Sequence, residues 1–374
     1  MNQNIEITVF HEFNSELQTK WNSIEKNIRM YVYQRYSWNF HWYNNFKNEY
    51  LFNIVLLENT TGVLGIFPFC INKKGIIKKL QFIGVEQSDY LTPICSPSLN
   101  YDLFTEVLKN IKFDYDVIYL KKIPEKIKGI KNNFSLNINA KVSDQSSQIV
   151  FSNSYDEYEK SLKSSFRNDN KRNLKRLTEL GDLKFINFDF EQQTQKEFLD
   201  FISITLEQKE RRIKNHLGKT NIKNNSVSSF YKKSFSLIDL NYKIHYSILM
   251  LNNKTILASH WGFYDEDTYY YTFPTIEGRE WYKYSAGKVL LNFLIHNAFE
   301  LNIKNFDFTI GDEIYKTNWI NSKMKIFSLQ IGVSYIGKFY LLFYNVLNKI
   351  KGNEKLKSIW RKFKRFIIFN KKRK

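Results

Sequence analysis

One short segment in the C-terminal half brings together side chains that can move protons. The run FDFTIGDEIYKTNW begins as a strand at residue 306, with Asp307 on the face opposite the alternating apolar residues. Asp312, Tyr315 and Lys316 follow in the turn after this strand. A carboxylate can act as a general base, and a phenol or an ammonium group as a general acid. The structural alternative is an ion pair between Asp307 and Lys316, with Tyr315 as a packing residue.

His260 is a further candidate base. It lies in LASHWGF, a segment predicted to be a central strand. Imidazole titrates near neutral pH, which suits proton transfer. A single histidine on a strand is more often a structural residue with satisfied hydrogen bonds, so both interpretations stay open.

The start of a later helix has the features of an anion-binding site. In YSAGKVLLNFLIH, the residues Ser285, Ala286, Gly287 and Lys288 begin a predicted helix over 285–301. The first N–H groups of a helix lack partners within it and carry partial positive charge, so they bind phosphate groups. Gly287 would let a ligand approach the backbone, and Lys288 would add charge. The alternative is an ordinary helix start capped by the Ser285 side chain.

Two other segments carry candidate ligand-binding residues. Asp89 and Tyr90 follow a strand and a glycine-containing turn, where a carboxylate could hold an amine or sugar hydroxyls. An Asx turn would explain Asp89 without any ligand. Lys209 and Arg212 lie on a predicted helix over 193–216, for which a solvated face is the alternative. Asp312, in the turn described above, is a further candidate of this kind.

The elements that must position these residues fall into two segments of similar size. Residues 1–148 are predicted to be mixed α/β, with a helix at 37–49. Residues 149–335 are predicted to run helix (155–180), strand, helix, three antiparallel strands, helix and two strands, the last over 327–336. Helices on a mainly antiparallel sheet predict an α+β fold. Residues 336–374 form a basic tail.

The composition excludes several classes of protein. The chain has 374 residues, of which 43% are apolar, and this rules out a disordered chain. Two cysteines and six scattered histidines exclude a disulfide scaffold and predict no metal site. There is no run of about 18 apolar residues to span a membrane and no secretory signal, so we expect a cytoplasmic protein.

The formal charge of +19 is concentrated in two places. Residues 338–374 hold 13 Lys and Arg against one acid, and residues 163–176 hold six against one. The rest of the chain is close to neutral, which argues against a uniformly basic nucleic-acid-binding protein. The pattern favours a phosphorylated ligand or an anionic membrane. For 163–176 a solvated helix face is the alternative.

The basic tail has the pattern of helices that lie in a membrane surface. Apolar residues form two stripes at helical spacing, with Lys and Arg on the opposite face of the second. The first stripe is Phe339, Leu342, Phe343, Val346, Leu347 and Ile350, and the second is Leu356, Ile359, Trp360, Phe363, Phe366 and Ile367. We expect 338–374 to contact an anionic membrane. The alternative is that the first stripe packs on the protein and the rest is a solvated extension.

Several motifs in order resemble one family. They are YQRYSWNFHWYNNF, LQFIGVEQSDYLTPI, SLKSSFRNDNKRNLKRLTELGDLKF, ILASHWGFYDEDTYYYTFPTI, YKYSAGKVLL and FDFTIGDEIYKTNW, spread over roughly residues 30–330. In order and spacing the chain resembles the CelD-type acyltransferases of the GNAT superfamily, which are related to the Fem peptidyltransferases. Ala286 stands where that family often has proline, but Gly287 is present.

The resemblance implies two tandem GNAT-like domains and acyl transfer from acetyl-CoA, or another acyl-CoA, to an amine. Asp307, Tyr315, Lys316 and His260 would then move the protons. Residues 285–288 would hold the cofactor pyrophosphate, and Asp89, Tyr90, Lys209 and Asp312 the acceptor. Both cysteines lie far from the predicted cofactor site, so direct attack in a ternary complex is favoured over a covalent acyl-enzyme. Relatives imply an acceptor in a cell-envelope sugar or polysaccharide precursor, modified at the inner face of the cytoplasmic membrane.

Two alternatives come from other functional classes. A Fem-like transferase would use aminoacyl-tRNA and would also need basic helices. A non-catalytic membrane adaptor on a degenerate GNAT fold would bind no CoA at all. The sequence leaves open the acceptor, the acyl group, the general base and the oligomeric state.

Overall fold

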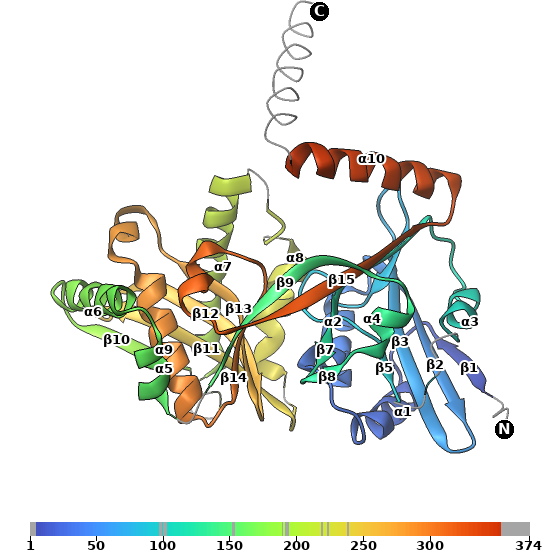
Figure 1. The fold of residues 1–374 in the computed structure, drawn as a ribbon, viewed down its shortest axis with the longest axis horizontal. Helices are drawn as coiled ribbons and strands as arrows, with labels where there is room; N and C mark the ends of the chain where they lie inside the picture. The colour runs from blue at the N-terminus through green and yellow to red at the C-terminus, as the bar shows by residue number, and fades with distance from the viewer. Residues whose placement is uncertain are drawn as a thin grey trace, which may run out of the picture.

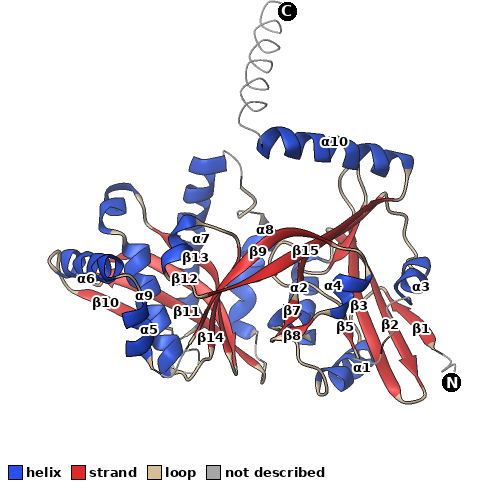
Figure 2. Cartoon of the chain, viewed as in Figure 1, coloured by secondary structure: helices blue, strands red, loops and turns tan. Residues whose placement is uncertain are grey.

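The chain folds as an α+β protein around one long twisted sheet (Figures 1 and 2). The computed structural model describes residues 5–352, except 97–98, 100–102, 152–153, 189, 191–193, 218–219, 223 and 238. In the described part the sheet has the order β1-β2-β3-β4-β6-β15-β9-β14-β13-β12-β11-β10, and β5 pairs with β3. The predicted fold class is confirmed.

The N-terminal half supplies one end of this sheet and the helices on it. Its elements are β1 (Glu6–Phe10), α1 (Ser15–Glu25), α2 (Tyr36–Phe46), β2 (Tyr50–Asn59), β3 (Gly62–Asn72), β4 (Lys79–Phe82), β5 (Ile94–Cys95), α3 (Phe104–Lys109), β6 (Val117–Pro124), β7 (Lys126–Ile127), β8 (Ile130–Lys131) and α4 (Asn133–Asn137). Trp38, Trp42 and Phe46, four residues apart on α2, are all buried. The apolar spacing predicted this helix correctly.

The C-terminal half supplies the other end. Its elements are β9 (Lys141–Val150), α5 (Tyr155–Ser161), α6 (Ser164–Thr178), β10 (Leu183–Asn187), α7 (Gln195–Leu217), α8 (Asn225–Lys232), β11 (Tyr242–Leu251), β12 (Thr255–Asp265), β13 (Thr268–Ile276), α9 (Ala286–Glu300), β14 (Asn305–Ile310), β15 (Ser322–Gly332) and α10 (Tyr335–Gly352), with 3₁₀ turns η4 (Arg279–Tyr284) and η5 (Ile314–Asn318). Strands β11, β12 and β13 are antiparallel, as predicted. Helices α5, α6 and α9 share an apolar core on one face of the sheet, and α7 and α8 on the other.

The predicted single helix over 155–180 is wrong, because the chain forms two helices there. Leu162 and Lys163 have extended backbones, with ψ of 149° and 134°. The Arg167 guanidinium donates to the carbonyls of Glu159, Lys160 and Leu162 at 2.7–3.3 Å. These carbonyls lie at the end of α5, where the helix offers no further N–H groups to bond them. The Arg167 side chain donates to them instead.

The last strand of the chain joins the two halves. β15 pairs with β6 on one side and with β9 on the other, and β9 in turn pairs with β14. The division that we placed at residue 148 falls inside β9. Aromatic side chains from both halves also share one core, where the Trp38 ring lies 5.1 Å from that of Phe263. The sheet and this core therefore hold the halves in a fixed relation.

Strands β13 and β14 part soon after they meet. They pair in parallel only at Thr268–Asn305, Tyr269–Phe306 and Tyr270–Asp307. Beyond Asp307 the pairing of β14 with β9 shifts register, and Thr309 has a φ of 58°. A residue other than glycine with such a φ bends the strand away from its regular path. The later residues of β13 thus face an opening instead of a neighbouring strand.

Helix α10 lies across the sheet end of the N-terminal half (Figure 1). We predicted a strand up to residue 336, but β15 ends at Gly332 and the helix begins at Tyr335. The Ser334 hydroxyl donates to Asp116 and accepts from the Gly337 N–H at 3.0 Å, which fixes the start of the helix. Among described residues, no helix has the length and apolar character needed to cross a membrane. The second predicted apolar stripe, 356–367, lies outside the described residues.

Close backbone contact at Gly337 gives a first prediction. A Cβ on this residue would lie 1.9 Å from the Asp116 carbonyl oxygen. Gly337→Ala should therefore push α10 away from β6 and lower the free energy of unfolding by about 1–3 kcal/mol, as in other overpacked sites. Urea unfolding and hydrogen exchange over 335–347 would measure this. Leu342→Ala, on the exposed side of the same helix, is the matched control, and an equal loss in both variants would contradict the explanation.

Candidate active site

Three adjoining cavities run from the start of α9 to the cleft between the halves. We name them the helix-end cavity (about 190 Å³), the central cavity (about 290 Å³) and the cleft cavity (about 570 Å³). The first two share Arg212, Tyr271, Pro274 and Tyr315, and the last two share Asp89, Lys209, Ile213 and Thr272. The central cavity occupies the opening between β13 and β14.

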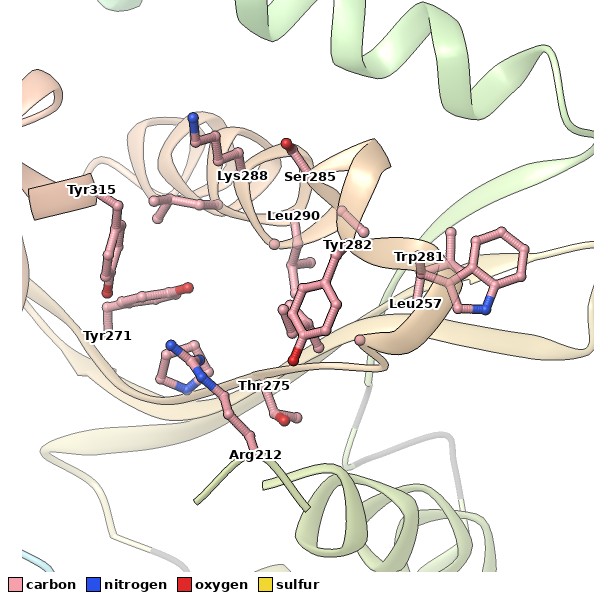
Figure 3. Close-up of a pocket in the computed structure, with 16 residues that line it drawn as sticks. Arg212, Leu257, Tyr271, Thr275, Trp281, Tyr282, Ser285, Lys288, Leu290 and Tyr315 are labelled. Carbon is pink, nitrogen blue, oxygen red and sulfur yellow. The ribbon is translucent and has the colours of Figure 1, made fainter. Parts of the chain in front are cut away.

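The helix-end cavity is built on the first turn of α9 (Figure 3). Ser285, Ala286, Gly287 and Lys288 all line it, so the structure brings these four predicted residues together. The interpretation of Ser285 as a side-chain cap is wrong, because it has a φ of 55° and its side chain makes no capping hydrogen bond. A Cβ on Gly287 would lie 2.9 Å from Ile276, so a larger residue would crowd the end of β13.

The charged lining changes sign along the series. Arg212 and Lys288 are the charged residues that line the helix-end cavity. Among the described residues, the charged side chains that line the cleft cavity are Glu49, Glu86 and Asp89 together with Lys209. Aromatic side chains complete its wall, among them Tyr50, Tyr231, Trp261 and Phe273. One end is suited to an anionic ligand and the other to a cationic one.

Lys209 lies between the central and cleft cavities on α7. Its ammonium donates to the Pro274 carbonyl at 3.1 Å and lies 4.5 Å from the centre of the Phe273 ring. Burial, together with the nearby Arg212 charge, lowers the pKa of Lys209 to about 8. A lysine with this pKa is partly neutral near physiological pH and can accept a proton. Lys209 can therefore take part in proton transfer where it borders both cavities, and its role in acceptor binding stays a prediction.

Tyr315 lies where the helix-end and central cavities meet. In Figure 3 its ring and that of Tyr271 lie close together at one side of the helix-end cavity. Burial raises the pKa of Tyr315, with a further contribution from the Glu313 carboxylate. Tyr315 therefore keeps its proton at neutral pH and can donate it.

Lys316 and Asp312 occupy positions less suited to chemistry. Lys316 lines the central cavity, but its ammonium is buried, pairs with Glu313 at 2.7 Å and donates to the Phe308 carbonyl at 3.1 Å. The ion pair that we considered between Asp307 and Lys316 is replaced by this one. Asp312 is exposed and is not among the residues lining the three cavities.

Asp307 and Tyr90 meet in a buried network behind the cavities. The Tyr90 hydroxyl lies 2.8 Å from both Asp307 oxygens, and Gln148 Nε2 and the Thr309 N–H donate to them at 2.9 and 2.7 Å. Burial raises the pKa of Asp307 to about 6 against these hydrogen bonds, which lower it. Neither residue lines the three cavities. Tyr90 instead ties the loop that carries Asp89 to β14.

Asp89 itself faces the cavities, while its predicted contact with an acceptor stays a prediction. It lines both the central and the cleft cavities. The Tyr33 hydroxyl donates to it at 3.4 Å, and the Lys122 ammonium lies 3.7 Å away. These contacts hold the carboxylate at the boundary between the two cavities.

His260 is buried one layer below the site. Its ring stacks on Tyr271 with 4.7 Å between centres, and its Nδ1 lies 3.2 Å from the Tyr269 hydroxyl. Burial lowers the pKa of His260 far below its usual value, so the ring is neutral. Its Nε2 has no hydrogen-bond partner among the described residues. His260 can position Tyr271, but it is not among the residues lining the three cavities.

Several lining residues were missed by the sequence analysis. Tyr271 is one of three consecutive tyrosines in β13, and the sequence offers no signal that distinguishes it from its neighbours. Glu49 and Glu86 follow an α-helix and a strand of the N-terminal half, and only the fold brings them to the cleft. Glu313 lies within the predicted motif and could have been included. Within the described ranges, no three His, Cys, Asp or Glu side chains gather as a metal site would require.

Comparison with known proteins agrees with this architecture. Residues 164–317 match the acetyltransferase (GNAT) domain family. In this segment the fold is a GNAT fold. Among curated proteins no sequence matches this chain. The family match supports an acyltransferase, while the narrower CelD-type resemblance stays a prediction.

Solved structures share the fold at low sequence identity. FemX superposes with a TM-score of 0.55 and 11% identity over 86% of this chain and 96% of FemX. A conserved protein of unknown function from Bacteroides thetaiotaomicron superposes with a TM-score of 0.52 and 10% identity, over 86% of this chain and 99% of that protein. The C-terminal domain of a putative lysylphosphatidylglycerol synthetase from Agrobacterium fabrum superposes with a TM-score of 0.51 and 10% identity, over 90% of this chain and 98% of that domain. These likenesses concern the fold alone.

The raised pKa of Asp307 predicts a pH-dependent loss of stability. The pKa is about 6 in the folded protein against an ordinary 3.8, so the folded state binds more protons between these values. Stability should then fall by about 3 kcal/mol as the pH rises through this window. Asp307→Asn removes the titration, so its free energy of unfolding should fall less between pH 4.5 and 7.5.

Urea unfolding at both pH values would measure the difference. Asp312→Asn, an exposed carboxylate five residues away, is the matched control and should follow the unchanged protein. If Asp307→Asn and the unchanged protein lose the same stability over this range, the buried carboxylate is not the cause.

Proposed function

We propose that this protein transfers an acyl group from acyl-CoA, with acetyl-CoA as the first candidate, to an amine. The observation that carries the proposal is the series of three cavities, cationic at the α9 end and acidic at the cleft end. CoA is anionic and an amine acceptor is cationic before it reacts. The two substrates would therefore enter from opposite ends and meet in the central cavity.

The helix-end cavity fits the phosphate-bearing part of CoA. The first turn of α9 offers backbone N–H groups, and Arg212 and Lys288 add charge that can pair with phosphate oxygens. Gly287 keeps the space beside Ile276 free of a side chain. When bound, acyl-CoA supplies an activated thioester to the neighbouring central cavity.

The open edge of β13 can orient that group. The Glu277 N–H bonds the Leu257 carbonyl of β12, so by alternation the backbone groups of Pro274 and Ile276 face away from β12. Proline costs no ladder hydrogen bond at this position. The Pro274 carbonyl is bound by Lys209, and the Ile276 N–H is directed to the opening. An N–H directed at a carbonyl oxygen stabilises the negative charge that develops on it.

Two residues then move the protons. Asp89 holds the acceptor ammonium, which loses its first proton to solvent, and neutral Lys209 takes the second as the nitrogen bonds the acyl carbon. The carbon–sulfur bond breaks, and Tyr315 donates its proton to the departing sulfur. Solvent then returns a proton to Tyr315 and takes one from Lys209. No cysteine lines the three cavities, in keeping with direct transfer. Asp307 and His260 act as positioning residues for Asp89 and Tyr271.

The cleft cavity suits an amine on a sugar or polysaccharide precursor. Three carboxylates attract a cation, and rings such as Trp261 and Tyr231 can pack against the face of a sugar. The CelD-type resemblance points to the same class of acceptor. Such an acceptor would be met at the inner face of the cytoplasmic membrane.

The pKa of Lys209 predicts the pH dependence of the reaction. With a pKa of about 8, the neutral fraction of Lys209 rises about tenfold from pH 7 to pH 9, so kcat/KM should rise with it. Lys209→Gln should lower kcat/KM by about 10²–10⁴-fold and remove this inflection. Lys196→Gln, at an exposed position on the same helix, is the control and should keep both. An unchanged pH profile in Lys209→Gln would exclude Lys209 as the base.

A second candidate function is the Fem-like transfer from aminoacyl-tRNA. It is favoured by α6, where Lys171, Arg172 and Lys175 are exposed and Arg176 lies 5.4 Å from the Tyr284 ring beside the start of α9. This basic face lies beside η4 and the start of α9, and it could hold nucleic-acid phosphates.

Binding separates these functions. Calorimetry with acetyl-CoA is expected to give saturable binding that weakens in Lys288→Ala, because Lys288 lines the helix-end cavity. Lys184→Ala, an exposed lysine on β10, should bind as the unchanged protein does. Binding of aminoacyl-tRNA without acetyl-CoA would favour the Fem-like reaction, and binding of neither would favour the non-catalytic adaptor.

A further inference from the structure

One face of α10 is apolar and uncovered. Phe339 is 71% exposed, Leu342 64% and Phe343 54%, and Tyr335, Ile336 and Val346 are exposed as well. The helix packs on the body through its other face, where Leu341, Tyr340 and Tyr344 meet Val117 and Tyr119 of β6. The predicted stripe from Phe339 to Val346 is therefore the outer face. The structure contradicts the alternative in which this stripe packs on the protein.

A second element extends this face. The β3–β4 hairpin passes beside α10, where Ile77 packs against its inner side. The Lys79 ammonium lies 4.9 Å from the ring of Tyr340. At the tip of the hairpin, Ile76 is 92% exposed. Two segments 260 residues apart in the chain thus place apolar side chains at one end of the molecule.

The charge around these side chains has a single sign. The hairpin carries Lys73, Lys74, Lys78 and Lys79, and α10 carries Lys338, Lys349 and Lys351, with no acid in either. Asp116, beneath the helix start, is bound by the Ser334 hydroxyl and the Lys78 N–H. In the sequence, the segment 353–374 that follows α10 holds ten Lys and Arg against Glu354, and it lies outside the described residues. Apolar side chains beside several lysines match a bilayer with anionic headgroups.

The same charges argue against the other occupants. A second copy of the chain would bring lysines against lysines across the face. The segment 353–374 would do the same if it folded back on it. Neither offers the negative charge that the face lacks.

We propose that the outer face of α10 and the tip of the β3–β4 hairpin together form a surface that binds an anionic membrane. The apolar side chains insert among the acyl chains close to the headgroups, and the lysines pair with lipid phosphates. The proposal stands without the acyltransferase function, because it depends on no residue of the three cavities.

The position of this surface has a consequence for the acceptor, which rests on the proposed function. The Tyr119 hydroxyl lies 3.2 Å from that of Tyr344 on α10. On the β3–β4 hairpin, the Lys73 N–H donates at 2.9 Å to the carbonyl of Glu49, a residue that lines the cleft cavity. The acidic cavity thus lies on the same side of the body as the membrane surface, and an acceptor attached to a lipid could reach it.

Vesicle flotation of the full-length protein tests the surface. The protein is expected to float with phosphatidylcholine vesicles that contain phosphatidylglycerol, and to stay behind with vesicles of phosphatidylcholine alone. Phe339→Glu/Phe343→Glu should weaken binding by about tenfold or more, because two acids replace inserted rings. Ile76→Glu, on the other element, should weaken it as well. Leu240→Glu, an equally exposed leucine elsewhere, is the matched control and should float like the unchanged protein.

Three outcomes would overturn the proposal. The first is that the unchanged protein fails to float with anionic vesicles. The second is that the double variant and Ile76→Glu bind as well as the unchanged protein, which would assign binding to residues 353–374. Sedimentation velocity could instead give a dimer that the double variant dissolves, which would make the face a contact between two copies. Circular dichroism should show all variants folded, since the changed side chains lie on the solvent side.

Discussion

The site depends on the point at which β13 and β14 part. Both strands begin in register, and their last paired residues are Tyr270 and Asp307. Asp307 is also the residue that Tyr90 of the N-terminal half binds with its hydroxyl. One buried carboxylate therefore marks the edge of the opening and fixes the loop of Asp89 beside it. A strand pairing that continued further would close the central cavity.

Burial and charge determine which polar residues can act in the cavities. Asp307 and His260 are buried away from the cavities. Burial is the largest cause of their shifted pKa values, so these shifts do not indicate a substrate site. Lys209 is different, because it borders the two cavities that Asp89 also lines. The contrast between Arg212 and Lys288 at one end and three carboxylates at the other gives the cavities a direction. That direction is the physical basis for assigning an anionic donor and a cationic acceptor.

The charge of the whole chain has a separate explanation. Most of the excess of +19 lies in 163–176 and 338–374. The structure places part of it on α6 beside the start of α9, and part around the uncovered face of α10. The first position suits the phosphates of a nucleotide or nucleic acid, and the second a lipid surface. The two proposed partners, a phosphate-bearing ligand and a lipid surface, thus depend on the same residue types set among different apolar side chains.

Local patterns in the chain determined its fold class, most of its helices and strands, and the residues Ser285–Lys288, Asp89, Lys209 and Tyr315 that line the cavities. These patterns work because periodicity, turn residues and helix starts act over a few neighbouring residues. Only the tertiary structure decided that Asp307, Tyr90 and His260 lie behind the site, that Glu49 and Glu86 lie in it, and that the stripe on α10 faces outward. The burial and the charged surroundings of these residues depend on segments that are far apart in the chain. A local sequence pattern does not show which of those segments come into contact.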